Sequence, residues 1–586
     1  MNGLLGGTDL RPGALARLAD FAASQGGATL HPPGRFALWR FGTPSGGLRA
    51  VSGDDVHAWL LGDWFEPPSP RSEPPPTQEL LAAYRREGHG WVGSVVGQFA
   101  LVLWDARRRE LALYRDDSSA QSLYYHRLPG GGLVFSDRLD LLVSCPLVPR
   151  RLSTEGLHEY LRFLDISPPN TVYAGVFGTE PGALWLHDRH GLHQRPAPAA
   201  RQAAPADPAP ATLDDAAAAL DDHLARAVAS RVRDTAGLVV FLSGGVDSTY
   251  LCALAAASGR PVTAITVGFD DAAADESAVA AAVAAALGVP HRVLRYSTGE
   301  YRRAFEDLAA AEYPVADPAG APTLLAFEQA RELADTALDG TGADTLLGIM
   351  PPRHQRLAVQ YAARLPFALR RVLAGAMAAV PRVRDYRPIL DFGDPQEVLV
   401  RWRGWSRREI EQLCGRQVSL AGTRFYRVFR GFAPAEHMAR YSALMGNLPD
   451  DRIHIATGLT GVRARFPFFD PGVTTFVQGL PEALRYAGGE HKRVLKHALA
   501  RRVPRALWDV PKHGFDFPFD TLLAADGYAL VRAYADAPTL ARLGCADDAP
   551  LVRTVADYVA GARHQRFRVW ALTVLGAWLQ HHDLTA

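Results

Sequence analysis

Hydrophobic and polar residues alternate in the first part of the chain. The segments 99–116 and 123–137 each place alternating apolar and polar residues around a turn, DARRRE in the first and PGGG in the second. Such alternation predicts antiparallel hairpins with one buried face. Short strands at this spacing predict a sandwich in which one sheet packs on another.

A different pattern begins at residue 212. The segment 212–232 has apolar residues on one helical face, and Thr212 with Asp215 forms a start similar to a capping box. That face consists of Leu213, Ala217, Leu220, Leu224 and Val228. An unbroken apolar run of strand length follows at 237–242, and two further segments typical of strands follow at 262–269 and 291–296, separated by helical segments. This β-α-β-α-β order predicts a parallel sheet with right-handed crossovers.

A Pro- and Ala-rich segment, residues 195–212, separates the two patterns and predicts an extended linker. It divides a domain of residues 1–194 from a larger one of residues 213–586. The chain has 586 residues, of which 48% are hydrophobic and 21% are charged. That composition is typical of globular proteins, and the length favours more than one core.

Composition argues against several classes of function. The net charge is +1, from 63 basic and 62 acidic residues, so the positive excess of a generic nucleic-acid or membrane binder is missing. No apolar run reaches the ~20 residues of a membrane span, and MNGLLGGTDLRPG lacks the pattern of an export signal. The four cysteines form no CxxC pair, so we expect a reducing, cytoplasmic location and no zinc site.

The first apolar run of the second domain ends in SGGVDS, and a predicted helix begins directly after it. Ligands bind at the carboxyl ends of parallel strands. Gly244 and Gly245 let backbone N–H groups surround an anion, and the helix N-terminus favours negative charge. Ser243 and Ser248 can donate hydroxyls to phosphate oxygens, and Asp247 can hold Mg²⁺. The alternative is a tight turn without a ligand, and the spacing differs from that of a P-loop.

A second acidic loop, DGTGAD, follows another predicted strand end at residues 339–344. The carboxyl ends of neighbouring parallel strands meet at one edge of a sheet. We therefore expect Asp344 to face Asp247 and to share a metal ion with it.

Lysine is almost absent from the chain. The only lysines are Lys492, Lys496 and Lys512, whereas every other basic residue apart from histidine is arginine. An ammonium group is compact and approaches a single oxygen as a point charge, unlike a planar guanidinium. The cluster therefore indicates a site that requires lysine, with chance survival under codon bias as the alternative.

Several segments in combination resemble the asparagine synthetases. SGGVDS is similar to the pyrophosphate loop of ATP pyrophosphatases, DGTGADTLLG resembles SGEGADELFGG, and residues 451–470 resemble DR…GLEARVPFLD. Residues 488–519 resemble a GG..K..LR.A…RPKxGF segment, and residues 97–125 resemble the family's glutaminase domain. The resemblance implies an α/β protein. A degenerate Ntn-type glutaminase-like α+β sandwich would precede a parallel-sheet ATP-pyrophosphatase domain with many helices.

The resemblance implies ATP and Mg²⁺ as cofactors and assigns roles to particular residues. The positions implied to line the adenine and ribose are Leu242, Val267 and Gly340. Lys492 corresponds to a lysine that contacts pyrophosphate, and Asp317 to a position near the acyl substrate. Lys512, in PKHGF, corresponds to the lysine that stabilises the tetrahedral state of amide formation.

The chain departs from asparagine synthetases in its N-terminal domain. Those enzymes need an N-terminal Cys nucleophile, whereas this sequence begins Met1-Asn2 and has its first cysteine at Cys145. We therefore expect this domain to be a scaffold and the attacking amine to belong to the substrate.

Two further departures lie in the synthetase domain. Thr341 stands where asparagine synthetase has Glu and β-lactam synthetases have Tyr. Threonine is a poor base, so this catalytic position fits a free peptide α-amine, whose pKa is about 8. Arg463 replaces the Glu of GLEAR, which indicates altered ion pairing or another acceptor shape.

These features most resemble the macrolactam-forming cyclases of lasso peptide biosynthesis. Such an enzyme adenylates an Asp or Glu side chain of a leader-free precursor peptide. The peptide's N-terminal amine then forms an isopeptide bond, releasing AMP and pyrophosphate. The implied partners are the precursor peptide, a leader peptidase and a leader-recognition protein, with no nucleic acid or membrane. The helical region 350–440 is a candidate peptide cleft or an ordinary helical layer.

Two alternatives stay open at this stage. One is a β-lactam synthetase or another AMP-forming amide ligase that acts on a small molecule. The other is a non-catalytic ATP-binding chaperone for a peptide.

Overall fold

The structure of the chain is a computed structural model. It describes residues 2–42, 47–65, 77–118, 120–196, 210–271, 275–347, 357–358, 361–380, 382–383, 386, 389–390, 392, 403–429, 452–486, 490–510 and 517–585. Within these residues, no helix is long and apolar enough to cross a membrane. Parts of the predicted peptide cleft at 350–440, and Lys512, lie outside the described residues.

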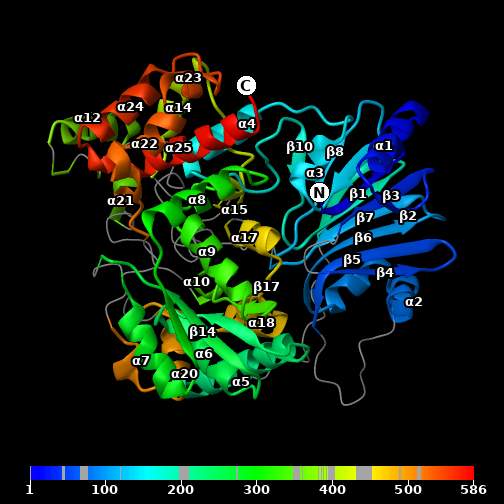
Figure 1. The fold of residues 1–586 in the computed structure, drawn as a ribbon, viewed down its shortest axis with the longest axis horizontal. Coiled ribbons are helices and arrows are strands. Elements are labelled where there is room, and N and C mark those ends of the chain that lie inside the picture. The colour runs from blue at the N-terminus through cyan, green and yellow to red at the C-terminus, as the bar shows by residue number, and fades with distance from the viewer. Residues whose placement is uncertain are drawn as a thin grey trace.

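Two antiparallel sheets of six strands form the N-terminal domain, drawn in blue and cyan in Figure 1. The first sheet has the order β10 (Val176–Gly178), β8 (Tyr124–Arg127), β9 (Leu133–Ser136), β1 (Gly3–Thr8), β3 (Phe36–Phe41) and β2 (Ala28–His31). The second has the order β12 (Gly191–Pro196), β11 (Ala183–Asp188), β7 (Glu110–Arg115), β6 (Gly97–Asp105), β5 (Val56–Trp64) and β4 (Leu48–Ser52). The helical segments here are α1 (Pro12–Ser24), α2 (Thr77–Glu87), η1 (Gly88–Ser94), α3 (Leu139–Ser144) and α4 (Thr154–Phe163).

Both hairpins expected from the alternating pattern are present, as β6–β7 and β8–β9. Their inward residues join one core between the sheets, in which the rings of Phe36 and Trp104 stack with centroids 5.1 Å apart. Phe36 comes from the first sheet and Trp104 from the second. The predicted sandwich is therefore confirmed, because apolar side chains from both sheets exclude water from the space between them.

A parallel sheet of five strands organises the C-terminal domain. Its order is β15 (His291–Leu294), β14 (Val262–Val267), β13 (Leu238–Phe241), β16 (Thr336–Leu338) and β17 (Arg463–Arg465). All four neighbouring pairs run parallel. The three predicted strands are β13, β14 and β15, each slightly shorter than its predicted segment. The sequence pattern did not indicate β17, a short strand that joins from far along the chain.

Helices cover both faces of this sheet, as Figure 1 shows for the green elements. Val240, Ala264 and Leu338 share a core with the helices α5 (Leu213–Val232), α6 (Val246–Ala256), α7 (Ser277–Leu287) and α20 (Arg493–Ala500). The alternate residues Val239 and Ile265 belong to the other core, with α8 (Thr298–Ala309), α9 (Gly320–Arg331) and α17 (Arg452–Thr460). Residues that alternate along buried strands thus serve two cores.

The remaining described helices extend the C-terminal domain. They are α10 (Ala343–Leu347), α12 (Phe367–Ala378), α14 (Arg407–Cys414), α15 (Arg424–Phe429), α18 (Pro471–Gly479), α19 (Glu482–Tyr486), α21 (Phe519–Ala524), α22 (Ala529–Tyr534), α23 (Ala537–Ala541), α24 (Ala549–Val559) and α25 (Arg566–His581). Eleven residues of α25 are buried, so this helix is the centre of the C-terminal bundle. It also receives a hydrogen bond from the N-terminal domain, because the Tyr160 hydroxyl donates to the Ala571 carbonyl at 2.9 Å.

The boundary between the domains differs slightly from the predicted one. Strand β12 continues to Pro196, two residues past the expected end at 194, because Pro196 still pairs with Ala183 of β11. Helix α5 begins at Leu213 as expected, and the Thr212 side chain accepts a hydrogen bond from the Asp215 N–H.

The N-terminal domain packs directly on strand β17, which is the edge of the parallel sheet. The Gln98 side chain donates to the Ala464 carbonyl at 3.1 Å and accepts from the Phe466 N–H at 2.8 Å. These bonds satisfy backbone groups that an edge strand would otherwise leave unpaired. Beside them, Asp63 pairs with Arg465 at 3.0 Å and with Arg463 at 3.4 Å.

This interface corrects one expectation for Arg463. Its guanidinium contacts Asp63 and, at 2.8 Å, Asp335, and it does not line the cavity described below. The expected change in ion pairing stays a prediction, and the position of Arg463 away from the cavity does not support a role in the acceptor shape. The reason is that Arg463 is on the edge strand β17 at the domain interface, and no residue of β17 lines the cavity.

Candidate active site

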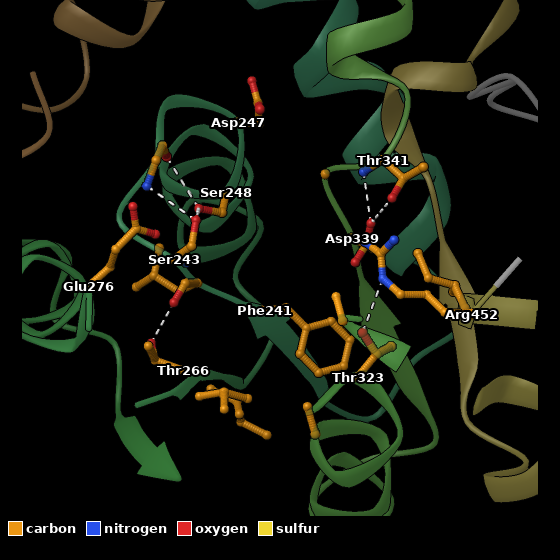
Figure 2. Close-up of a pocket in the computed structure, with 18 of the residues that line it drawn as sticks. Phe241, Ser243, Asp247, Ser248, Thr266, Glu276, Thr323, Asp339, Thr341 and Arg452 are labelled. Carbon is orange, nitrogen blue, oxygen red and sulfur yellow. Dashed lines mark hydrogen bonds between the residues drawn. The ribbon is translucent and has the colours of Figure 1, made fainter. Parts of the chain in front are cut away.

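A cavity of about 410 Å³ opens at the carboxyl ends of β13, β14 and β16 and at the start of α6 (Figure 2). Its volume is in the range of small-molecule sites. The residues that line it are Phe241, Leu242, Ser243, Gly245, Asp247, Ser248, Ile265, Thr266, Val267, Phe269, Glu276, Asp317, Ala319, Thr323, Ala326, Phe327, Asp339, Gly340, Thr341, Gly342, Asp344, Arg452 and Ile453.

The SGGVDS loop forms one side of the cavity. The Ser243 N–H donates to the Ser248 Oγ at 3.1 Å, and the Gly245 N–H donates to the Ser243 Oγ at 3.3 Å. Gly244 has a φ of +75°, and a Cβ there would lie 2.7 Å from a methyl carbon of Val279. Only glycine fits both constraints. The loop thus presents two hydroxyls and the N-terminus of α6, an eleven-residue helix, to the cavity.

Asp247 and Asp344 meet at one cation, Lys492. The Lys492 Nζ lies 2.5 Å from the Asp247 Oδ2 and also pairs with the Asp344 Oδ1. Lysine 492 is only 8% exposed, and its φ of +55° is in the left-handed region, at the N-cap of α20. Burial disfavours the ammonium, but the two carboxylates outweigh it, so the pKa of Lys492 is raised and the side chain stays charged.

One oxygen of this cluster is not satisfied. The Asp247 Oδ1 is buried and has no hydrogen-bond partner among the described residues. A buried carboxylate oxygen without a partner is costly in free energy. Its position on the cavity wall indicates that a ligand completes the cluster.

The second acidic loop lies beside the first. Strand β16 pairs with β13, with Leu338 level with Val240, so Asp339 follows at the same sheet edge. The Asp339 Oδ1 accepts the Thr341 N–H at 2.8 Å and the Thr341 hydroxyl at 2.5 Å. Figure 2 shows this pair across the cavity from Ser243 and Ser248.

An arginine and an aspartate from separate helical regions meet on the same side. Arg452, the first residue of α17, pairs with Asp317 through its Nη1, and its Nε donates to the Thr323 Oγ1 at 3.1 Å. The Asp317 Oδ1 accepts the Ala319 N–H at 2.9 Å, which fixes the carboxylate in its loop. The rest of this wall is apolar, and the rings of Phe241 and Phe327 lie 4.8 Å apart.

The structure brings most of the predicted site residues to this one cavity. Those that line it are Leu242, Ser243, Gly245, Asp247, Ser248, Val267, Gly340, Thr341, Asp344 and Asp317. Gly244 shapes the loop without lining the cavity, and Lys492 reaches it through its two aspartates. Lys512 lies outside the described residues.

Sequence reasoning assigned no role to several lining residues, among them Phe241, Glu276, Thr323, Asp339 and Arg452. Two of these carried a signal. Asp339 is the first residue of the second acidic loop, directly after a strand, and Arg452 belongs to the DR pair at 451–452. The other three have no local pattern that distinguishes them from ordinary helix or strand residues.

All four cysteines have free thiols, and the Cys414 Sγ lies 3.2 Å from the His158 Nε2. Burial raises the pKa of the thiols of Cys145 to about 11 and of Cys252 to about 12. Burial also raises the pKa of Cys545 to about 12 and, more modestly, that of Cys414. Since the thiolate is the reactive form, a raised pKa lowers the reactivity of these thiols near neutral pH.

Comparison with known proteins identifies the family. The chain matches the asparagine synthase family over residues 219–580 and a glutamine amidotransferase domain over residues 74–196. The chain belongs to the asparagine synthase family. Enzymes of this family use ATP, and this chain is an asparagine synthetase-like, ATP-dependent amide ligase. The predicted resemblance to asparagine synthetases is thus confirmed at the level of the family, while the closer likeness to lasso peptide cyclases stays a prediction.

Individual relatives are distant. The putative glutamine-hydrolyzing asparagine synthetase of Mycobacterium bovis is 27% identical over 533 residues, covering 86% of this chain and 79% of that protein. Asparagine synthetase 1 of Bacillus subtilis is 24% identical over 466 residues, covering 75% and 71%. The solved glutamine phosphoribosylpyrophosphate amidotransferase of B. subtilis matches with 10% identity and a TM-score of 0.21, covering 50% of this chain and 65% of that one. That score is too low to carry an argument.

Proposed function

We propose that this amide ligase is a macrolactam synthetase of the kind that closes lasso peptides. It adenylates an Asp or Glu side chain of a precursor peptide and joins the activated acyl group to the N-terminal amine of the same peptide. The observation that carries the proposal is the convergence of Asp247, Asp344 and Lys492 beside the SGGVDS loop. This arrangement suits a triphosphate whose α-phosphorus is attacked while pyrophosphate leaves.

The cluster also fits Mg²⁺. Asp247 and Asp344 offer carboxylate oxygens, the ligands that Mg²⁺ prefers, and the Asp247 Oδ1 has no partner among the described residues. The described residues contain no group of three or more His, Cys, Asp or Glu side chains that could hold a metal by themselves. This agrees with an ion held partly by phosphate oxygens. When bound, Mg²⁺ would neutralise charge on the phosphates.

The source of the amine distinguishes this proposal from asparagine synthesis. Release of ammonia from glutamine in this family needs an activated cysteine, and all four thiols have raised pKa values. An amine that the substrate itself carries removes the need for that step. A peptide that holds both the carboxylate and the amine provides both reactants.

The proposed cycle has two bond-forming steps. A side-chain carboxylate oxygen attacks the α-phosphorus of ATP, and pyrophosphate leaves from the end held by Ser243, Ser248 and Lys492. The amine nitrogen then attacks the acyl carbon, the C–O bond to AMP breaks, and one proton leaves the nitrogen. The products are the macrolactam, AMP and pyrophosphate. The proposed partners are the precursor peptide, a leader peptidase and a leader-recognition protein, in the cytoplasm.

The decisive experiment combines ATP–pyrophosphate exchange with mass spectrometry. The probes are synthetic linear peptides that carry a free N-terminal amine and one Asp or Glu at increasing distance from it. We expect a peptide-dependent exchange and a product lighter by one water, with an isopeptide bond located by fragmentation. Exchange without any peptide cyclisation, but with amide formation on a small amino acid, would replace this proposal by a small-molecule ligase.

A pair of variants controls this experiment. Asp247→Asn removes charge from the cluster and should abolish exchange, whereas Asp557→Asn changes an exposed residue of α24 and should leave exchange unchanged. Absence of exchange in the wild-type protein with every peptide would refute adenylation and favour a non-catalytic peptide-binding role.

A further inference from the structure

Asp339 differs from the other aspartates that line the cavity. Asp247 and Asp344 are paired with Lys492, and Asp317 is paired with Arg452. For Asp339, the described part of the chain provides no ion pair; its recorded partners are the N–H and hydroxyl of Thr341. Asp339 is therefore a cavity carboxylate that is held by neutral donors.

Both of these hydrogen bonds go to the same oxygen. The Asp339 Oδ1 accepts the Thr341 N–H and hydroxyl, while no described residue donates to the Oδ2. The side chain is half-buried and lines the cavity. A carboxylate fixed through one oxygen keeps the other available to accept a proton from a bound substrate.

The location of Asp339 suits the second chemical step. It lies at the end of β16, next to the β13 strand that leads into the SGGVDS loop. The loop after it touches the start of α6, since a Cβ on Gly340 would lie 3.3 Å from the Asp247 Cβ. An acyl group attached to the α-phosphate of a nucleotide at that loop would therefore be next to Asp339.

The second step must release a proton near this point. A peptide α-amine has a pKa of about 8, so much of it arrives as an ammonium near neutral pH. Even the neutral amine carries an extra proton once its nitrogen has bonded to the acyl carbon. A nearby carboxylate both attracts the ammonium and accepts the proton.

We propose that Asp339 is the proton acceptor for the attacking amine, and that Thr341 positions it. In this step, which rests on the proposed function, the N–C bond forms and the C–O bond to AMP breaks. AMP leaves with that electron pair, and one proton moves from nitrogen to the Asp339 Oδ2 and then to solvent. The Thr341 hydroxyl donates a hydrogen bond to the Asp339 Oδ1, so Thr341 is a positioning residue and not the base.

The sequence segment that resembles this loop supports the assignment. SGEGADELFGG has a serine and a glutamate where this chain has Asp339 and Thr341. In this chain the carboxylate is therefore at position 339, two residues before the position of the glutamate in SGEGADELFGG. A hydroxyl residue, Thr341, takes the glutamate's position. The two side chains are in contact, so either order places one carboxylate and one hydroxyl at the same wall.

The test separates adenylation from amide formation. In Asp339→Asn, ATP–pyrophosphate exchange should stay within about threefold of wild type, while macrolactam formation should fall by about 100-fold or more. Hydroxylamine, a nucleophile that is largely unprotonated at neutral pH, should trap the acyl adenylate as a hydroxamate at the wild-type rate. Hydroxamate formation also shows that the variant is folded and makes the adenylate.

Two further variants sharpen the result. Thr341→Val keeps the shape but removes the hydroxyl, and should lower macrolactam formation by about tenfold with unchanged exchange. The double variant Asp339→Ser with Thr341→Glu restores a carboxylate to this wall and should recover part of the macrolactam activity lost in Asp339→Ser alone.

Three outcomes would overturn the proposal. Asp339→Asn could form macrolactam at nearly the wild-type rate, or lose exchange, hydroxamate and macrolactam together, which would place Asp339 in adenylation or in folding. A failure of Thr341→Glu to rescue Asp339→Ser, with exchange intact, would also contradict it. Failure of the proposed function itself is distinguishable, because the wild-type protein would then form no macrolactam.

Discussion

Three buried carboxyl groups of the N-terminal domain have different surroundings from the two carboxylates beside Lys492. In the N-terminal domain, burial raises the pKa of Asp116 to about 7, of Asp137 to about 6 and of Glu159 to about 8. They accept hydrogen bonds mainly from backbone N–H and amide groups. In the C-terminal cavity, Asp247 and Asp344 instead face the charged Lys492.

The difference separates structural from chemical use of the same residue types. A carboxyl group that is buried without a cation is pushed toward its neutral form and serves as an internal hydrogen-bonding group. A carboxylate held against a lysine can exchange that partner for another cation or a phosphate-bound ion. The buried acids of the N-terminal domain thus hold backbone groups in place, whereas the two carboxylates of the cavity are paired with a cation.

The N-terminal domain still affects the site through its contact with β17. Gln98 and Asp63 hold the backbone and arginines of that strand. The Arg465 carbonyl in turn accepts the Asp339 N–H at 3.1 Å. A domain without a reactive thiol therefore supports the loop that carries Asp339.

The largest expected effect comes from removing the cation of the C-terminal cluster. Lys492→Met leaves two carboxylates facing each other and removes the positive charge beside the phosphate loop. ATP–pyrophosphate exchange should fall by at least about 100-fold. Lys496→Met is the matched control, because Lys496 is one turn later on the same helix and lies 3.8 Å from Glu490 in a partly exposed pair. Equal losses in both variants would contradict a specific role for Lys492.

The next effect concerns the contact between the domains. In Asp63→Asn, the buried Arg465 loses one of its two carboxylate partners and keeps Asp234. The free energy of unfolding, measured in urea, should fall by about 3 kcal/mol. Asp55→Asn breaks the exposed pair with Arg107, so it should change the free energy of unfolding by less than about 0.5 kcal/mol. Similar small changes in both would show that the interface pair contributes little.

A smaller effect is expected from the neutral acids of the N-terminal domain. The raised pKa of Glu159 means that the folded state keeps a proton that the unfolded state loses above its ordinary pKa near 4.5. Stability should therefore fall as pH rises through this window, by up to about 2.7 kcal/mol over two pH units. Glu159→Gln is always neutral, so its Tm should decline less than that of wild type from about pH 5.5 to 7.5. A parallel decline in both proteins would contradict the assignment.

The smallest effect is expected from removing the buried thiol of the N-terminal domain, because the proposed reaction does not use a thiol. Cys145→Ala should retain macrolactam formation within about twofold, because the thiol is buried and its pKa is raised to about 11. Addition of glutamine should not raise the rate of either protein. A glutamine-dependent product that disappears in Cys145→Ala would reverse the contrast between the two domains.

Much of the fold could be predicted from the sequence, because the pattern of apolar and polar residues within a short segment indicates whether that segment is a strand or a helix. Alternation indicated the hairpins β6–β7 and β8–β9, an unbroken apolar run indicated β13, and the β-α-β-α-β order indicated β14 and β15. The glycine and acidic loops were recognisable because each directly follows a strand. The pattern could not indicate β17, which is three residues long and pairs with β16 from far along the chain.

The sequence by itself determined that an anion-binding loop and an acidic loop each follow a strand. It also determined that both loops and all three lysines belong to the second domain. Tertiary structure alone decided which partners meet: Lys492 reaches Asp247 across 245 positions, and Arg452 reaches Asp317 across 135. It also decided that, among the described residues, the Asp339 N–H donates to the Arg465 carbonyl while its carboxylate accepts only from Thr341. The physical reason is that element type follows local side-chain periodicity, whereas ion pairing and burial depend on how distant elements pack.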